Sequence, residues 1–205
     1  MRKSGLDNNT LIFLVGDNGG QTKDGARNLP WRGGKATNWD GAVHEPYIVR
    51  WTGTLPAGKE FTGLVSTLDI YATAAVAAGA KCSANLDGVD ILPFLRGQKS
   101  GDPHEALFWR WLDFPKDPLR AMRSGPWRLL LGKTDQLYNL ANDPGETKDL
   151  AAENPEKVAT LKAMFNRWEQ SLPSPIANAK RNAKPQSGPP SGRGWAFATK
   201  ERTKP

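Results

Sequence analysis

A short apolar run near the start of the chain ends abruptly in a glycine-rich polar loop. Residues 10–15 read Thr-Leu-Ile-Phe-Leu-Val, and residues 16–20 read Gly-Asp-Asn-Gly-Gly. A continuous apolar run of this length is typical of a strand buried on both faces of a parallel sheet, and ligands in open α/β sheets bind just beyond the carboxyl ends of such strands. The pattern therefore predicts a ligand site at Asp17 and Asn18.

Further α/β elements follow up to about residue 101. We expect a second strand near 47–51, a helix over 68–78 and a short helix over 90–95, each helix followed by a glycine. Asp69 lies near the start of the first helix, where a carboxylate favours the positive end of the helix dipole. Residues 1–101 are therefore predicted to form one portion of an α/β domain.

The pattern changes over residues 102–172. Aromatic and aliphatic runs, each ended by Pro, Gly or Asp, predict an antiparallel meander. A helix that starts at Asn154 follows, and its apolar positions fall at helical spacing, so it is expected to pack across the small sheet. The predicted strands are 106–111, 119–123, 127–131 and 137–140, and the apolar helix positions are Val158, Leu161, Met164, Phe165 and Trp168.

Four tryptophans of this region are expected in the core and its interfaces rather than in a glycan platform: Trp109, Trp111, Trp127 and Trp168. The acidic residues after Asp143 are expected mostly at a solvated turn and helix start.

Residues 173–205 are interpreted as a disordered basic tail. They hold seven Lys and Arg residues against Glu201 alone, so most of the formal net charge of +7 lies there. A solvated tail with no partner is the favoured interpretation. The alternative is weak binding of a polyanion through counterion release, with Trp195 and Phe197 available to dock or stack.

Composition is that of a globular chain with a modest core, since 38% of the residues are hydrophobic. No window approaches the roughly 18 consecutive apolar residues of a membrane span. The N-terminus is basic but lacks the apolar segment of a secretory signal, which argues against export of the chain as written. One cysteine, Cys82, allows no internal disulfide and leaves the redox compartment undetermined.

The residues after the first strand suit a metal and an anion. A carboxylate beside an amide oxygen, as in Asp17 and Asn18, fits a hard cation such as Ca²⁺ or Mg²⁺, and the flanking glycines permit a tight turn. Lys35, at the end of the same loop, adds a mobile positive charge for an anion. From these residues alone, a simple turn remains an open alternative.

Longer stretches in a fixed order resemble the type I sulfatases, the formylglycine-dependent enzymes of the alkaline phosphatase superfamily. The resemblance extends over roughly residues 5–170 and implies an α/β fold, namely the C-terminal portion of the sulfatase fold with a small antiparallel sheet and helix subdomain. The matching stretches are residues 9–20, 29–35, 39–46, 48–51, 64–69, 86–90, 137–140 and 143–146.

The resemblance implies that Asp17 and Asn18 complete a Ca²⁺ site and that Lys35 contacts the sulfate group. In this family the nucleophile is a formylglycine made from the cysteine of a Cys-x-Pro-x-Arg motif, well upstream of the Asp-Asn-Gly strand. Cys82 is followed by Ser-Ala-Asn-Leu and is therefore not that nucleophile. The formylglycine and the other metal ligands would precede Met1, and we expect no turnover from this chain alone.

Two histidines are weaker candidates. His44 stands where the family commonly has the arginine of Glu-Gly-Gly-x-Arg-x-Pro, and a loop or helix-end residue is the favoured interpretation over a catalytic one. His104 precedes the first strand of the small sheet, in a subdomain that borders the active site in the family. It is a candidate for reaching the cleft, although a purely structural role is favoured.

The resemblance thus implies a sulfuric ester hydrolase, arylsulfatase-like, that acts on aryl or carbohydrate sulfates with bound Ca²⁺ or Mg²⁺. A phosphate or phosphonate ester hydrolase is the rival enzyme, and the Gly33-Gly34-Lys35 loop favours the sulfatase. A non-catalytic remnant that binds a partner or polyanion is the alternative of another class. Full-length relatives are often periplasmic, secreted or lysosomal, and no location is assigned to this chain.

Overall fold

The structure is a computed structural model that describes residues 2–81, 83, 85–111 and 119–173. It has two compact units, Met1–Ser171 and Leu172–Pro205, so the α/β portion and the small sheet belong to one unit. The interpretation of the basic tail, with Trp195 and Phe197, falls on residues outside the described ranges, as does the one concerning Cys82.

The strand predicted at the start of the chain is present as β1, Ile12–Val15. It pairs antiparallel with β2, Tyr47–Arg50, so the expectation of a parallel sheet is wrong for the pairing in the described residues. Burial on both faces is also wrong, because the cross-strand neighbours Leu14 and Ile48 are 63% and 54% exposed. β2 lies antiparallel beside β1, and the two strands form a two-stranded sheet in which neither strand is fully buried.

The first predicted helix is confirmed as α1, Asp69–Ala77, and the second as the shorter α2, Leu92–Leu95. Asp69 does more than favour a helix dipole, because its buried carboxylate accepts hydrogen bonds from the backbone of Ser66 (2.7 Å) and Val89 (2.9 Å). The chain before α1 and the chain before α2 are therefore joined at one side chain. Short 3₁₀ helices lie in the connecting segments, at Arg2–Ser4 (η1), Asp7–Asn9 (η2), Thr22–Asp24 (η3) and Asp40–Ala42 (η4).

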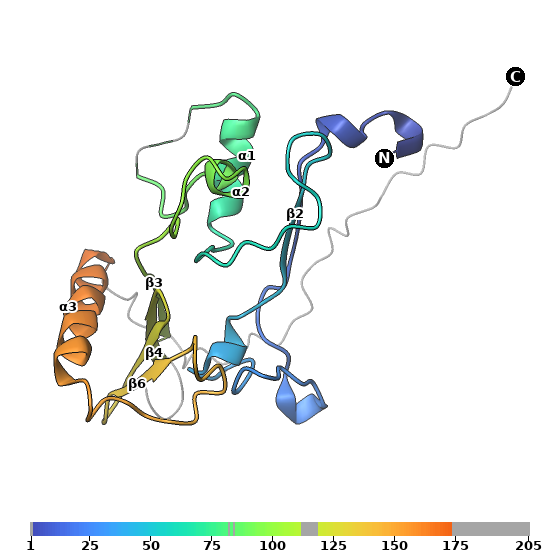
Figure 1. Ribbon diagram of the computed structural model, residues 1–205. Coiled ribbons are helices and arrows are strands. Elements are labelled where there is room, and N and C mark those ends of the chain that lie inside the picture. The colour runs from blue at the N-terminus through green and yellow to red at the C-terminus, as the bar shows by residue number, and fades with distance from the viewer. Residues whose placement is uncertain (1, 82, 84, 112–118, 174–205) are drawn as a thin grey trace, which may run out of the picture. The chain divides into compact units, whose positions relative to one another are not determined.

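The predicted meander is confirmed. Its strands run β3-β4-β5-β6 in spatial order, and all neighbours are antiparallel (Figure 1). The predicted long helix is α3, Pro155–Ser171, which lies against β4 and β5. The strands are β3 Leu107–Trp111, β4 Leu119–Ser124, β5 Trp127–Leu131 and β6 Gln136–Asn139.

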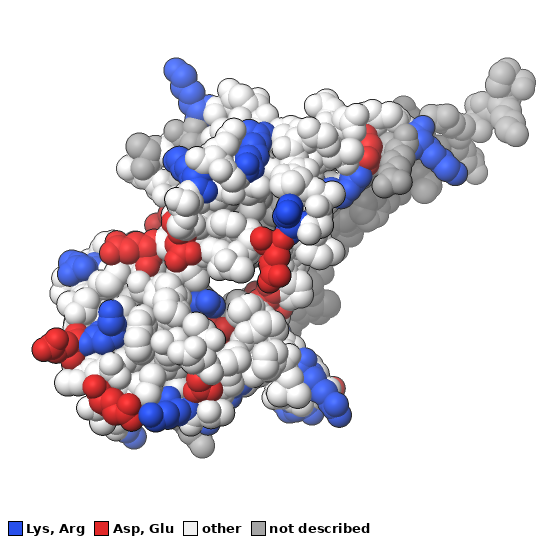
Figure 2. All heavy atoms as spheres, in the orientation of Figure 1, with Lys and Arg blue, Asp and Glu red and all other residues white. Residues whose placement is uncertain are grey.

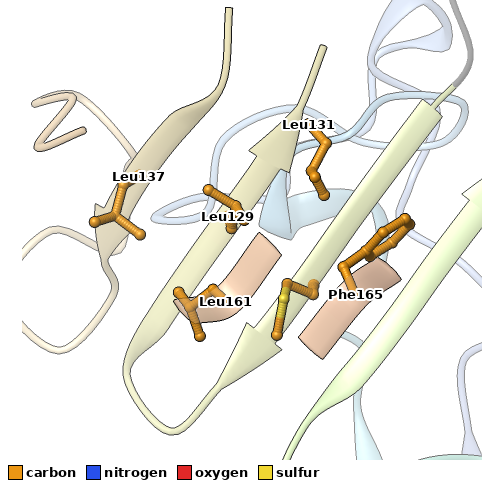
Figure 3. Packing of buried hydrophobic residues seen from close by; sticks show 6 residues of the cluster. Leu129, Leu131, Leu137, Leu161 and Phe165 are labelled. Carbon is orange, nitrogen blue, oxygen red and sulfur yellow. The ribbon is translucent and has the colours of Figure 1, made fainter. Parts of the chain in front are cut away.

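The main apolar core lies between α3 and the small sheet. Figure 3 shows Leu161 and Phe165 of α3 directed at leucines from the strands. Trp127 and Trp168 pack against this cluster, as expected, whereas Trp111 is half exposed at the end of β3. Trp109 packs against a second, smaller cluster of buried hydrophobic residues, separate from the main one. The main cluster consists of Met122, Leu129, Leu131, Leu137, Leu161 and Phe165.

Within the described residues, no helix is long and apolar enough to cross a membrane.

Truncation of the α3 side of this core is expected to destabilise the fold. Leu161→Ala removes a fully packed side chain and leaves a cavity, so the free energy of unfolding should fall by about 2–5 kcal/mol. Asn166→Ala, on the exposed face of the same helix, is the matched control and should change it by less than about 0.5 kcal/mol. Urea unfolding followed by circular dichroism measures both, and equal losses would contradict the packing described here.

Candidate functional site

The loop that follows β1 is held against residues 41–46 by backbone hydrogen bonds. Gly16 donates to the carbonyl of Pro46 (3.1 Å), and Gly19 donates to the carbonyl of Ala42 (2.9 Å). A Cβ on Gly19 would lie 1.9 Å from a backbone oxygen of Gly41, so only glycine permits this approach. Asp17 and Asn18 therefore lie between two residues whose backbones are hydrogen-bonded to a neighbouring segment, and not in an isolated turn.

A second loop folds back onto the first through one asparagine. The Asn28 side-chain amide donates to the carbonyls of Gly20 (3.0 Å) and Gly33 (2.8 Å), and its oxygen accepts from the Gly20 backbone (2.9 Å). The backbone of Lys35 also donates to the Gly20 carbonyl (3.3 Å). Lys35 thus starts beside the Asp-Asn loop, and its side chain is exposed.

A cavity of about 1160 Å³ lies beside these loops. Asp17, Asn18 and His44 all contribute to its lining, whereas Lys35 and His104 do not. The structure therefore brings three of the five predicted site residues together. On the face shown in Figure 2, acidic and basic side chains are interspersed over the described residues, so no extended surface of one charge sign marks a binding site.

The acidic side of the cavity carries a local excess of negative charge. The pKa of Glu45 is raised, mainly because the side chain is desolvated and further because the charge of Asp17 opposes its ionisation. Gly16 lies so close to Glu45 that a side chain on Gly16 would collide with the carboxylate. Two carboxylates held near one another favour a nearby cation.

The donors present fit a calcium ion in part. Asp17 offers a carboxylate, and Asn18 donates its amide NH₂ to the Gly19 carbonyl (3.0 Å), which leaves its side-chain oxygen as the remaining acceptor. Hard oxygen ligands are those that Ca²⁺ and Mg²⁺ prefer, but Ca²⁺ takes about six to eight of them. The described residues contain no group of three or more His, Cys, Asp or Glu side chains able to hold a metal. Asp17 and Asn18 therefore supply a fraction of a coordination shell.

At the buried edge of the cavity, both carboxylate oxygens of Asp40 have a side-chain partner. One oxygen lies 3.1 Å from Nη1 of Arg128, and the other lies 2.7 Å from Nδ1 of His44. Burial acts to raise the pKa of Asp40, but the hydrogen bond from His44 and the charge of Arg128 outweigh it, and the pKa lies below its usual value. Asp40 is therefore ionised at neutral pH although its side chain is buried.

Glu146 completes this buried cluster. Its Oε2 accepts a hydrogen bond from the Asp40 backbone (2.7 Å), and its Oε1 lies 3.2 Å from Nε of Arg128. Arg128 also donates to the carbonyl of Asn38 (2.6 Å). The expectation of a solvated turn is wrong for Glu146, which is fully buried, and this burial raises the pKa of its carboxyl group. The inward position of Glu146 gives the buried Arg128 a second anion beside Asp40.

His44 occupies the arginine position of the resembling family and reaches the cavity. Its ring stacks on Trp31 with centroids 4.0 Å apart and planes at 26°. The side chain is 36% exposed, and Trp31 lines the same cavity. His44 therefore has one ring nitrogen on the buried Asp40 cluster and a face fixed by an aromatic ring.

His104 lies elsewhere, against α1. Its Nε2 is 2.8 Å from Oδ1 of Asp69, and the two side chains are 10% and 0% exposed. This contact joins the segment before β3 to the start of α1. This geometry is that of a structural residue, and His104 is not among the residues that line the cavity.

Comparison with known proteins gives a consistent family. The sulfatase family model matches residues 1–80. Steryl-sulfatase of Rattus norvegicus is 37% identical over 116 residues, which are 52% of this chain and 20% of that protein. The uncharacterized sulfatase YdeN of Escherichia coli K12 is 35% identical over 221 residues, which cover 88% of this chain and 39% of that protein.

Solved structures show the same relationship. The crystal structure of Ps i-CgsB in complex with k-i-k-neocarrahexaose matches with a TM-score of 0.72 and 31% identity, over 82% of this chain and 38% of that one. The phosphonate monoester hydrolase of Agrobacterium radiobacter matches with a TM-score of 0.61 and 25% identity, over 83% and 37%. The chain therefore spans between 20% and 39% of the length of these relatives.

Loss of the buried cation is expected to be costly. Arg128→Met would leave Asp40 and Glu146 buried without their shared partner, so the free energy of unfolding should fall by about 3–5 kcal/mol. Lys162→Met is the matched control, because it breaks a 2.6 Å ion pair with Asp135 in which the lysine is half exposed. Its cost should be about 0–1 kcal/mol. Chemical denaturation of both variants tests this, and similar values would contradict the role of burial.

Acid is expected to weaken the same cluster. A carboxyl whose folded pKa is depressed, as for Asp40, adds stability above its unfolded pKa of about 3.9, and this stability is lost as the pH falls through the folded value. The free energy of unfolding should therefore drop below about pH 4, and less steeply in Asp40→Asn. Urea titrations across this range test the prediction. An identical slope in both proteins would show that Asp40 does not contribute.

Proposed function

Because this chain belongs to the sulfatase family, we propose that it supplies calcium-binding and sulfate-binding residues of a sulfuric ester hydrolase. The observation that carries the proposal is the placement of Asp17 and Asn18. They follow β1 directly, are fixed by the contacts of Gly16 and Gly19, and line the cavity.

Asp17 is the anionic metal ligand in this proposal, and Asn18 is a neutral ligand through its side-chain oxygen. The ion, when bound, would supply positive charge to the non-bridging oxygens of a sulfate group. The raised pKa of Glu45 supports a cation here, because a positive charge near Asp17 would relieve the repulsion between the two carboxylates.

Lys35 is the proposed sulfate contact. Its backbone is fixed beside Gly20, and its exposed side chain forms no ion pair with any residue that the structure describes and has a stem of four methylene groups. An ammonium group on such a stem can follow an anion into the cavity beside the Asp-Asn loop. To contact a sulfate group in this way, only the side chain of Lys35 has to move.

A carbohydrate sulfate is the favoured substrate class. Ps i-CgsB, the 31% identical relative, has been crystallised in complex with k-i-k-neocarrahexaose, which is a carbohydrate. An aryl sulfate is the alternative within the same reaction. A phosphonate or phosphate ester is the rival substrate, supported by the similarity to the phosphonate monoester hydrolase.

Hydrolysis also needs a nucleophile. The sequence around Cys82, Cys-Ser-Ala-Asn-Leu, lacks the proline and arginine of the formylglycine motif. We therefore expect this chain on its own to bind Ca²⁺ and sulfate without turning over a sulfate ester. A polypeptide that only binds an anion is the non-catalytic alternative.

Isothermal titration of the full chain tests these roles. Asp17→Asn should weaken Ca²⁺ binding at least tenfold, a change of about 1.4 kcal/mol, because a neutral amide replaces the charged ligand. Lys35→Ala should weaken the binding of inorganic sulfate by a similar factor in the presence of Ca²⁺ and leave the unfolding midpoint unchanged.

Asp24→Asn and Lys23→Ala, both exposed on η3, are the matched controls and should bind as the parent does. Sulfate binding that is indifferent to both Ca²⁺ and Lys35 would overturn the proposal. Tighter binding of methylphosphonate than of sulfate would favour the rival substrate.

A further inference from the structure

We propose that His44 recognises a hydroxyl group of the alcohol part of the ligand through its Nε2 atom, with Asp40 as the residue that positions it. The inference rests on the proposed function and adds a specificity residue to it. The ligand chemistry is that of a sugar, which carries hydroxyl donors next to the sulfated oxygen.

The tautomer of His44 follows from the state of Asp40. Asp40 is ionised, and an ionised carboxylate can only accept, so Nδ1 of His44 carries the proton in their 2.7 Å hydrogen bond. Asp40 cannot turn away, because Arg128 holds its other oxygen at 3.1 Å. In the neutral form of the imidazole, this tautomer leaves a lone pair on Nε2.

The environment of His44 fixes the ring and leaves Nε2 available. Trp31 stacks on the ring, and no described residue hydrogen-bonds to Nε2. Arg123 lies 3.8 Å from the Asp40 oxygen that His44 contacts, too far to replace the histidine as its donor. The nearby carboxylate of Glu45 is an acceptor, like Nε2 itself, and does not compete for it.

A lone pair at this position distinguishes the hydroxyl groups of a sulfated sugar from its sulfate group. A hydroxyl can donate to Nε2, whereas a sulfate oxygen can only accept and is repelled. Arginine, the usual residue of the family pattern quoted above, has donors only and would favour an anion. Trp31 and Trp109 also line the cavity.

The direct test is ¹⁵N NMR of the imidazole groups in the labelled full chain. The chain has two histidines, so His44→Gln assigns the spectrum, and the ring of His104, bonded to Asp69, is an internal control. At pH 8 the His44 signals should show a protonated Nδ1 and an unprotonated Nε2. Galactose and galactose 6-sulfate should shift the Nε2 signal of His44. None of the probes, sodium sulfate included, should shift the signals of the His104 ring.

Variants provide a second measure. His44→Arg should weaken the binding of galactose 6-sulfate at least fivefold relative to the binding of inorganic sulfate, as expected for one lost hydrogen bond. His44→Gln keeps an acceptor and should recover part of the affinity. The measurements on the parent chain need no variant, so a folding defect does not remove the test.

The outcomes separate this inference from the proposed function. An Nε2 signal that is protonated at pH 8, or one that does not move with either sugar while sulfate binds, overturns the role of His44 alone. Failure of sulfate to bind with or without Ca²⁺ overturns the proposed function, and a shift of Nε2 by galactose would still support the hydroxyl contact.

Discussion

A buried guanidinium is the constraint on which the arrangement of this protein depends. Arg128 lies in β5 with a side chain that is 1% exposed, and a charge in such a position is tolerated only when anions surround it. Asp40 and Glu146 come from opposite sides of β5 in the sequence and meet there. One residue thereby joins the loop before β2 and the turn after β6 to the small sheet.

The candidate site inherits its geometry from this cluster. Asp40 starts η4, and the residues that follow it accept hydrogen bonds from Gly16 and Gly19 on either side of Asp17 and Asn18. Asp40 also contacts the His44 ring, so the loop that carries Asp17 and Asn18 and the histidine both depend on the segment that Asp40 starts. A contiguous set of contacts thus runs from the interior of the small sheet to the cavity.

The sequence predicted elements well where a periodic pattern was strong. The meander and α3 follow from runs bounded by turn residues and from apolar positions such as Leu161 and Phe165. The parallel pairing of β1 was wrong because an apolar run does not identify its neighbour, and here the neighbour is β2. Asp17 and Asn18 were predicted as site residues because a position directly after a strand is a signal that is local in the sequence. Both residues line the cavity.

The buried cluster was not predictable by the same means. An arginine between Trp127 and Leu129 was the available signal, but its anions lie far away in the sequence, and Glu146 sits in a segment that reads as a surface turn. Burial of a charged residue is a tertiary property, decided by whether partners arrive. The family pattern marked position 44 as unusual, while its link to Asp40 required the structure.

Hydrogen exchange of the backbone amides in Arg128→Met would test this dependence most directly. If Arg128 holds the site loop, the amides of Gly19, Gly41 and His44 should exchange faster in the variant, while those paired within β3 and β4 keep their protection. Unchanged protection at these three amides, in a variant that remains folded, would contradict the account.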